Sequence, residues 1–361
     1  MKKLGFGFMR LPMLEDGSVD LVHTQKMVDE FMAAGFQYFD TAHPYIGGQS
    51  EKILKLCLTD KYPRESYVLT DKLSPNNFEN EEEIRPLIDE ELAACGVEYF
   101  DYLLMHAMNA SYYEKYTRTR AFEIAKELKE EGKIRHIGMS FHDTPEVLDR
   151  ILSEHPEVEV VQIQFNYLDV ENPNVQSMDC YKVVRKHDRQ VLIMEPVKGG
   201  ALANLPEEAA AILSALGGGS HASYAIRYAA SQEGVLSVLS GMSTLEQVQD
   251  NIGYMAEFEP LSEAEFAALE RVRQVVMSQK TIGCTACRYC MDVCPQQIPI
   301  PEVFNVYNRK QKYLDPGWRY GAVTKGKKKA SECLDCGACE EACPQKLEIR
   351  ALLKKVAETF E

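Results

Sequence analysis

Eight short apolar segments recur along the first two thirds of the chain, each separated from the next by a segment with helical periodicity. The apolar segments read LGFGFM, FQYFDTA, YVLTDKL, FDYLLMH, IRHIGMS, VEVVQIQF, QVLIMEP and VLSVLSG. Eight strands that alternate with helices predict an α/β fold whose parallel sheet closes into a (β/α)8 TIM barrel. A doubly wound open sheet is the alternative, but no G-x-G-x-x-G sequence follows the first strand.

The barrel domain is expected to span residues 1–278. The segment LSEAEFAALERVRQVVMSQK follows the last predicted strand, and its Ser262 and Glu265 have the spacing of a helix capping box. We expect this helix to end the barrel. Cysteine motifs and a basic spacer of helical pattern follow, so residues 279–361 are expected to form a second, small and mainly helical domain.

Two copies of one cysteine motif lie in this second region. Eight of the eleven cysteines follow residue 283, and the segments CTACRYCMDVCP and CLDCGACEEACP are offset by 49 residues at all four cysteines. Both read C-x2-C-x2-C-x3-C-P, the sequence of bacterial ferredoxins, in which the fourth cysteine binds the other cluster. Structural zinc sites are the alternative, but they normally use two C-x2-C pairs rather than triplets followed by Cys-Pro.

The motifs therefore predict a ferredoxin-like domain with two [4Fe–4S] clusters that exchange their fourth ligands. The ligands expected for the first cluster are Cys284, Cys287, Cys290 and Cys343. Those expected for the second cluster are Cys333, Cys336, Cys339 and Cys294. The three remaining cysteines lie in helical patterns and are expected to be core or half-exposed thiols: Cys57, Cys95 and Cys180.

Charge and hydropathy exclude several classes of function. A net charge of −15 would repel a phosphate backbone, which argues against nucleic-acid binding. No apolar run approaches the ~20 residues that a membrane span requires. The N-terminal segment MKKLGFGFMRLPM is interrupted by Arg10 and Pro12, so we predict no signal peptide and expect a cytoplasmic protein.

Four polar residues stand at the ends of successive predicted strands. Asp40 and Tyr45 follow the second strand, Lys72 ends the third and His106 ends the fourth. The carboxyl ends of barrel strands meet at one rim, so these four side chains are expected to converge. An ammonium group beside a tyrosine favours the phenolate and would lower its pKa from about 10 toward neutrality. The set therefore indicates an acid–base site.

The segments DTAHPY, DKL and LLMH resemble the aldo-keto reductases, in which Asp, Tyr, Lys and His occur in this order. The resemblance covers about residues 1–260 and includes YIGGQSE, GKIRHIGMS and GMSTLEQVQDN. With the cysteine motifs, the whole chain resembles an iron–sulfur branch of that family. The resemblance implies that Tyr45 gives a proton to a carbonyl oxygen, that Lys72 and Asp40 tune it, and that His106 orients the carbonyl.

The resemblance also implies an NAD(P)H cofactor. It assigns Ser140 and Gln162 to the nicotinamide carboxamide and Asn251 to the adenine end, and Lys198 is a candidate for a phosphate contact. A solvated surface lysine is the alternative for Lys198.

Several positions depart from the family pattern. Phe141 stands where many members have Asn, and Met194 stands where many have the aromatic residue that stacks on the nicotinamide. Gly241 and Gln247 occupy the places of basic residues that grip the 2′-phosphate, and their neutrality removes the main reason to prefer NADPH over NADH.

Nicotinamide transfers two electrons as hydride, whereas each cluster transfers one. A flavin in the barrel, one-electron chemistry, or clusters with a structural or regulatory role would each resolve this mismatch. We therefore expect an oxidoreductase that acts on a small carbonyl or alcohol. The alternatives are an electron-transfer protein whose barrel is a docking scaffold, and a redox sensor whose barrel binds a nucleotide or flavin without turnover.

Basic residues concentrate in the spacer between the two cysteine motifs. They are Arg309, Lys310, Lys312, Arg319, Lys325, Lys327, Lys328 and Lys329. Such a patch is expected either to guide an acidic redox partner, a ferredoxin or flavodoxin, or to form a solvated helix face. Apart from His106, the histidines show no metal-ligand spacing, and His43 is expected to be a solvated loop residue or to line the pocket near Tyr45.

Overall fold

The computed structural model describes the chain except at residues 173–174, 279–280 and 314–317. Eight parallel strands form a closed barrel in the order β1 to β8, and β1 pairs with β8 through the register Phe6 to Ser240. The strands are β1 Leu4–Gly7, β2 Tyr38–Asp40, β3 Val68–Leu73, β4 Phe100–Met108, β5 Ile134–Phe141, β6 Val160–Gln164, β7 Gln190–Met194 and β8 Val235–Ser240. The predicted TIM barrel is therefore confirmed.

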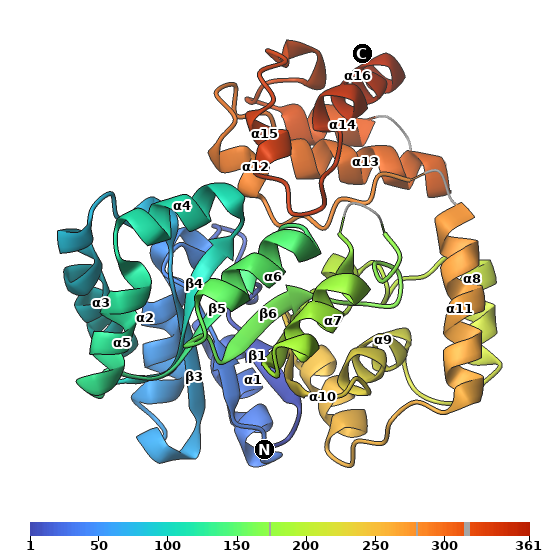
Figure 1. Cartoon of the computed structure of the whole chain (residues 1–361). Helices are drawn as coiled ribbons and strands as arrows, with labels where there is room; N and C mark the ends of the chain where they lie inside the picture. Colours follow the sequence, from blue (N-terminus) through green and yellow to red (C-terminus); the bar gives the residue numbers. More distant parts are fainter. Residues whose placement is uncertain (173–174, 279–280, 314–317) are drawn as a thin grey trace.

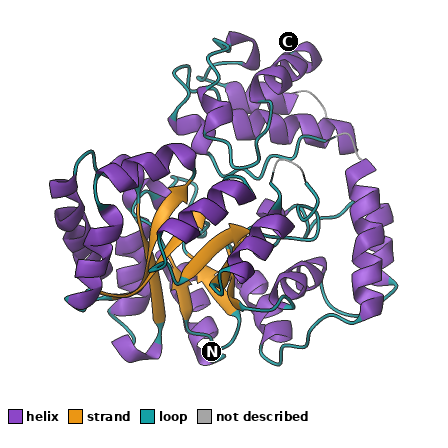
Figure 2. Cartoon of the chain, in the orientation of Figure 1, coloured by secondary structure: helices purple, strands orange, loops and turns teal. Residues whose placement is uncertain are grey.

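Helices cover the outside of the barrel, as Figures 1 and 2 show. They are α1 Leu21–Ala33, α2 Ser50–Leu54, α3 Glu81–Cys95, α4 Ala110–Arg118, α5 Ala121–Glu130, α6 Pro145–Glu154, α7 Ser177–Lys186, α8 Glu207–Ser214, α9 His221–Ala230, α10 Leu245–Met255 and α11 Glu263–Ser278. The capping box of α11 is confirmed, because Ser262 N–H donates to the Glu265 carboxylate at 2.7 Å and Ser262 Oγ accepts from Glu265 N–H at 3.3 Å.

The C-terminal region is a helical layer over the carboxyl ends of the strands (Figure 1). Its helices are α12 Tyr289–Asp292, α13 Ile300–Tyr313, α14 Trp318–Thr324, α15 Ala338–Glu341 and α16 Ile349–Phe360. They enclose a hydrophobic core of their own, which includes Phe304, Leu353 and several of the motif cysteines. The expected start of this domain, residue 279, lies outside the described residues. None of the helices described here combines the length and apolar character that crossing a membrane would require.

The described residues of the barrel domain form three hydrophobic clusters, one of which packs α8, α9 and α11 together. A second cluster fills the interior of the ring of strands and consists of Tyr38, Leu104, Val160, Leu192 and Leu239. A much larger core fills the space between the sheet and the helices, and Cys57, Cys95 and Cys180 are buried in it, as expected of core thiols.

Gly138 in β5 is required by the packing inside the barrel. A Cβ atom there would stand 2.5 Å from Leu104 Cδ2 and 2.7 Å from the Val160 carbonyl oxygen. We therefore expect Gly138→Ala to lower the free energy of unfolding by about 1–3 kcal/mol, as overpacking does. Thermal unfolding followed by circular dichroism would measure it. As a control, Gly253→Ala on the open surface of α10 should be neutral or stabilise by up to about 1 kcal/mol. Equal melting temperatures for the two variants would contradict the packing argument.

Candidate active site and metal centres

Lys72 lies at the end of β3 and is completely buried. Its ammonium group donates to Asp40 Oδ1 at 2.7 Å and to the Thr41 carbonyl oxygen at 2.6 Å. The other Asp40 oxygen accepts from Gln162 Nε2 at 3.1 Å. Residues at the ends of β2, β3 and β6 thus provide the hydrogen-bond partners of a buried ion pair at one rim of the barrel.

Tyr45 and His106 lie against this ion pair. The Tyr45 ring centroid is 4.8 Å from Lys72 Nζ and 5.8 Å from the His106 ring, edge to face. His106 Nδ1 is 2.7 Å from Ser74 Oγ. Burial lowers the pKa of His106 well below its usual value, and Lys72 acts in the same direction. The imidazole is therefore neutral, with one nitrogen able to donate a hydrogen bond. The structure brings all four predicted residues together.

The expected direction of the Tyr45 pKa is wrong. Burial raises this pKa well above its usual value, and the carboxylates of Asp40, Asp71 and Glu195 raise it further. The Lys72 ammonium lies over the ring and donates its hydrogen bonds to Asp40 and Thr41, so burial prevails. A protonated phenol suits a proton donor.

A pocket opens beside Tyr45. Asp40, Tyr45, Gln162 and Met194 line it from the barrel. The second domain contributes Thr285, Cys287, Tyr289, Pro344 and Gln345. Tyr289 is a hydrogen-bond partner of Tyr45, and this contact lowers the pKa of the phenol, against the effect of burial. The C-terminal domain therefore forms one wall of the barrel pocket.

Polar contacts hold the two domains together at this pocket. The side-chain amides of Gln164 and Gln345 exchange hydrogen bonds of 3.0 and 2.8 Å. Lys198 Nζ donates to Asp169 Oδ1 at 2.6 Å and to Gln345 Oε1 at 3.2 Å. Because Lys198 is buried in an ion pair, it is not the solvated residue of the sequence-based alternative, and a phosphate contact would have to replace its bond to Asp169.

The residues predicted to bind a nicotinamide cofactor divide into two groups. Gln162 lines the pocket, and Ser140 is buried at the end of β5, where its hydroxyl oxygen accepts from Ala107 N–H. The Asn251 side-chain amide donates a hydrogen bond to Ser240 Oγ and accepts one from the Tyr254 hydroxyl group. The Gln247 side-chain oxygen accepts a hydrogen bond from Ser243 N–H. Of these four residues, Gln162 is the one that lines the pocket described beside Tyr45.

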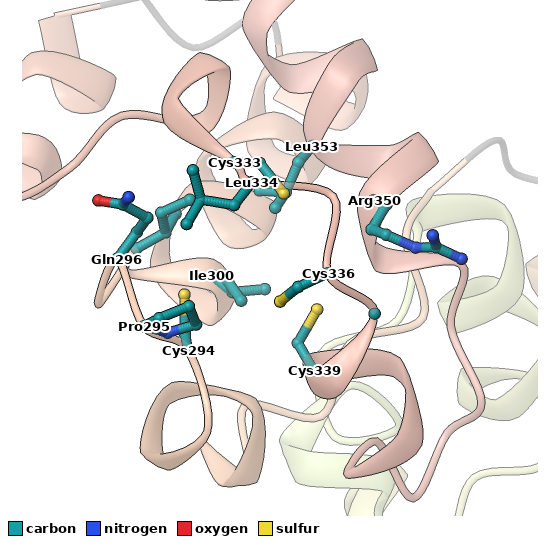
Figure 3. Close-up of a pocket in the computed structure, with 12 residues that line it drawn as sticks. Cys294, Pro295, Gln296, Ile300, Cys333, Leu334, Cys336, Cys339, Arg350 and Leu353 are labelled. Carbon is teal, nitrogen blue, oxygen red and sulfur yellow. The ribbon is translucent and has the colours of Figure 1, made fainter.

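The eight motif cysteines line two cavities. Cys284, Cys287, Cys290 and Cys343 line one cavity. Cys294, Cys333, Cys336 and Cys339 line another. Figure 3 shows sulfur atoms of the second set facing a common space. Each group contains three cysteines of one motif and the fourth of the other, which is the exchanged arrangement predicted from the sequence.

The cavities fit iron–sulfur clusters. Apolar side chains such as Ile300 and Phe304 surround the first set of thiols, and Ala286 N–H donates to Cys284 Sγ at 3.4 Å, which would stabilise a thiolate. Thr285, Cys287 and Gln345 line both this cavity and the barrel pocket. The second cavity is at the surface, where Cys336 is exposed.

Sequence reasoning missed several residues of the pocket. Tyr289, Gln345 and Arg10 contact it from segments far apart in the chain, and His142 follows β5. Tyr289 lies inside the first cysteine motif, but nothing in the motif indicates that it reaches the barrel. His142 adjoins Ser140 and Phe141, so its place after a strand end was an available signal.

Comparison with known proteins identifies both regions. Residues 3–274 match the model of the aldo/keto reductase family. This chain belongs to that family. Residues 283–347 match the model of a 4Fe-4S dicluster domain. The protein is therefore an oxidoreductase of aldo/keto reductase type that carries a C-terminal 4Fe-4S dicluster domain, as the sequence resemblance implied.

Individual relatives share the barrel. L-galactose dehydrogenase of Arabidopsis thaliana is 28% identical over 72% of this chain and 85% of its own length. An aldo-keto reductase structure from Bacillus halodurans, described as a holo form, has a TM-score of 0.62 and 24% identity over 75% of this chain and 91% of that one. A Klebsiella pneumoniae aldo-keto reductase in complex with NADPH also has a TM-score of 0.62, with 19% identity over 75% and 90%.

The exchange of fourth cysteines has a testable consequence. Cys294→Ala should disturb the cluster held by the cysteines beyond residue 332, although Cys294 belongs to the first motif by sequence. Cys343→Ala is the matched variant and should disturb the cluster held by Cys284, Cys287 and Cys290. Electron paramagnetic resonance of the reduced protein, with iron analysis, would distinguish the two. Damage by Cys294→Ala to the cluster of its own motif would overturn the exchanged assignment.

Proposed function

We propose that this protein reduces a small carbonyl compound to an alcohol, or catalyses the reverse reaction, in the pocket shared by the barrel and the dicluster domain. The observation that carries the proposal is the position of Tyr45, a protonated phenol that faces this pocket beside a neutral imidazole and a buried ammonium group. The overall reaction adds two electrons and two protons to the C=O group.

Each residue has a distinct part. Tyr45 gives its phenolic proton to the carbonyl oxygen as the carbonyl carbon is reduced, and this is general acid catalysis. His106 positions the carbonyl oxygen through a hydrogen bond. The Lys72 ammonium, fixed by Asp40, stabilises the phenolate that remains.

A nicotinamide cofactor supplies hydride when bound, and the pocket residue Gln162 and the buried Ser140 are the proposed contacts of its carboxamide. Iron–sulfur clusters supply electrons one at a time, and the eight motif cysteines are their proposed ligands. A flavin is the alternative occupant of the pocket. Binding of NADH, NADPH, FMN and FAD to the anaerobically purified protein would decide between these cofactors, and exclusive binding of a flavin would replace nicotinamide in the proposal.

Tyr45→Phe should lower the turnover of a carbonyl substrate by about 10²–10⁴-fold, the usual effect of removing a general acid. Cofactor affinity should be nearly unchanged, because the hydroxyl group serves proton transfer rather than binding. Steady-state kinetics and cofactor titration would measure the two effects. Tyr62→Phe is the control, since its hydroxyl group bonds to Asp29 on the surface. Full activity of Tyr45→Phe would remove this phenol from the mechanism.

We also propose that a ferredoxin or flavodoxin exchanges electrons with the dicluster domain. Lys325, Lys327, Lys328 and Lys329 are exposed in the segment before Cys333, close in sequence to the second cysteine set. The Lys328 ammonium is paired with Glu332 at 2.6 Å, so it partly serves the local turn. Side-chain placement at Lys312 lies outside the described residues. Positive charge near an exposed cluster would attract an acidic partner.

The double substitution Lys325→Glu with Lys327→Glu should slow the reduction of the clusters by an acidic partner at low salt. Charge complementarity raises encounter rates by about 10–10³-fold, and the double variant loses it. The difference should shrink as ionic strength rises. Stopped-flow reduction would measure it. The control is Lys26→Glu with Lys61→Glu, an equal charge change at exposed barrel positions. Equal rates for both double variants would leave the basic residues with a structural role only.

A further inference from the structure

A second cluster of titratable side chains lies behind the active site, between β3 and the helices α2 and α3. Glu51 is on α2, Asp71 on β3 and Glu91 on α3, and their exposed fractions are 1%, 0% and 0%. Burial raises the pKa of Glu51 to about 8 and raises that of Asp71 and Glu91 well above the usual value. The three carboxyl groups are buried and interact with one another electrostatically, and the carbonyl chemistry uses none of them.

A histidine completes this group. His43 Nδ1 lies 3.1 Å from Glu51 Oε2. One ligand atom from each of His43, Glu51 and Glu91 lies within 4.8 Å of the other two. Bonds of about 2.0–2.2 Å from one ion place its nitrogen and oxygen ligands about 3–4 Å apart, so small side-chain movements would bring all three atoms to one ion. His43 is half-buried, with 22% of its side chain exposed, and it hydrogen-bonds to Glu51 in this cluster, whereas the described pocket beside Tyr45 is lined by other residues.

The carboxyl groups differ in their partners. Asp71 accepts from Lys72 N–H at 2.8 Å and faces Cys95 Sγ at 3.4 Å. Both oxygens of Glu91 are buried, and neither has a hydrogen-bond partner among the described residues. A buried carboxyl group without a partner is costly, and most such groups in proteins are satisfied by a donor, a water or an ion. Glu91 therefore points to a missing partner.

We propose that His43, Glu51 and Glu91 bind one divalent metal ion of the Mn²⁺, Fe²⁺ and Zn²⁺ class. One imidazole nitrogen with two carboxylate groups suits these ions, whereas Ca²⁺ and Mg²⁺ prefer oxygen ligands alone. The ion supplies the missing partner of Glu91 and offsets the charge of the acidic cluster. Because His43 is two residues from Tyr45, it also ties the loop that carries Tyr45 to α2 and α3. The site is separate from the cysteine cavities, and it does not depend on the proposed reaction.

The competing explanation is that protons replace the ion, with neutral carboxyl groups sharing hydrogen bonds. Mn²⁺ distinguishes the two, because it favours carboxylate and imidazole over thiolate ligands. The experiment uses the full chain, purified anaerobically with its clusters, and follows the electron paramagnetic resonance signal of free Mn²⁺ during titration. We expect one Mn²⁺ per chain and a higher melting temperature with Mn²⁺, since an ion that binds only the folded state stabilises it.

Glu91→Gln should abolish both the binding and the shift in melting temperature. The matched control is Glu90→Gln, an exposed neighbour on the same helix, which should bind Mn²⁺ as the unchanged protein does. If Glu91→Gln fails to fold, Glu51→Gln and His43→Asn carry the same expectation. Absence of Mn²⁺ binding to the unchanged protein, or equal binding by the Glu91 and Glu90 variants, would overturn the proposal and favour shared protons.

Discussion

The buried ion pair of Asp40 and Lys72 is the interaction on which the active site depends. Removing two charges from water costs several kcal/mol for each ion, so the pair is stable only because further groups satisfy it. Thr41 and Gln162 provide these groups, and the hydrogen bonds among the four residues link the ends of β2, β3 and β6. The Lys72 ammonium lies 4.8 Å from the centroid of the Tyr45 ring, and the Asp40 carboxylate adds to the effect of burial in raising the pKa of the phenol.

A second polar network joins the barrel to the dicluster domain. Gln164 and Gln345 satisfy each other, and Lys198 links this amide pair to Asp169. Buried polar networks of this kind favour one arrangement, because a partly broken network leaves unsatisfied groups in a low dielectric. The network holds the segment around Cys343 against the barrel mouth. A cysteine cavity and the barrel pocket therefore share a wall.

Sequence patterns predicted the features that depend on local periodicity and on the rule that the carboxyl ends of barrel strands meet at one rim. Eight apolar runs predicted the barrel, and the convergence of strand ends predicted that four polar side chains meet at one rim. The spacing of the cysteines gave their grouping. Contacts between distant segments had no such signal: Tyr289 reaches Tyr45, and Glu91 reaches His43, only in the folded chain. The Tyr45 pKa was predicted in the wrong direction because the surroundings that bury the phenol, including segments of the second domain, come together only in the folded chain.

Arg10, in the loop after β1, and Gly241 line the same pocket as Asp40 of the ion pair. Gly241 and Gln247 lack the basic groups that the family pattern has at these positions, but a Cβ atom on Gly241 would stand 3.1 Å from Arg10 Cδ. The Arg10 guanidinium donates to the Thr285 carbonyl oxygen at 2.9 Å and lies 3.5 Å from the carboxylate of Glu195. Positive charge is thus present at the rim, but the chain itself balances it. A phosphate group bound at this rim would have to compete with Glu195 and Thr285 for the Arg10 guanidinium.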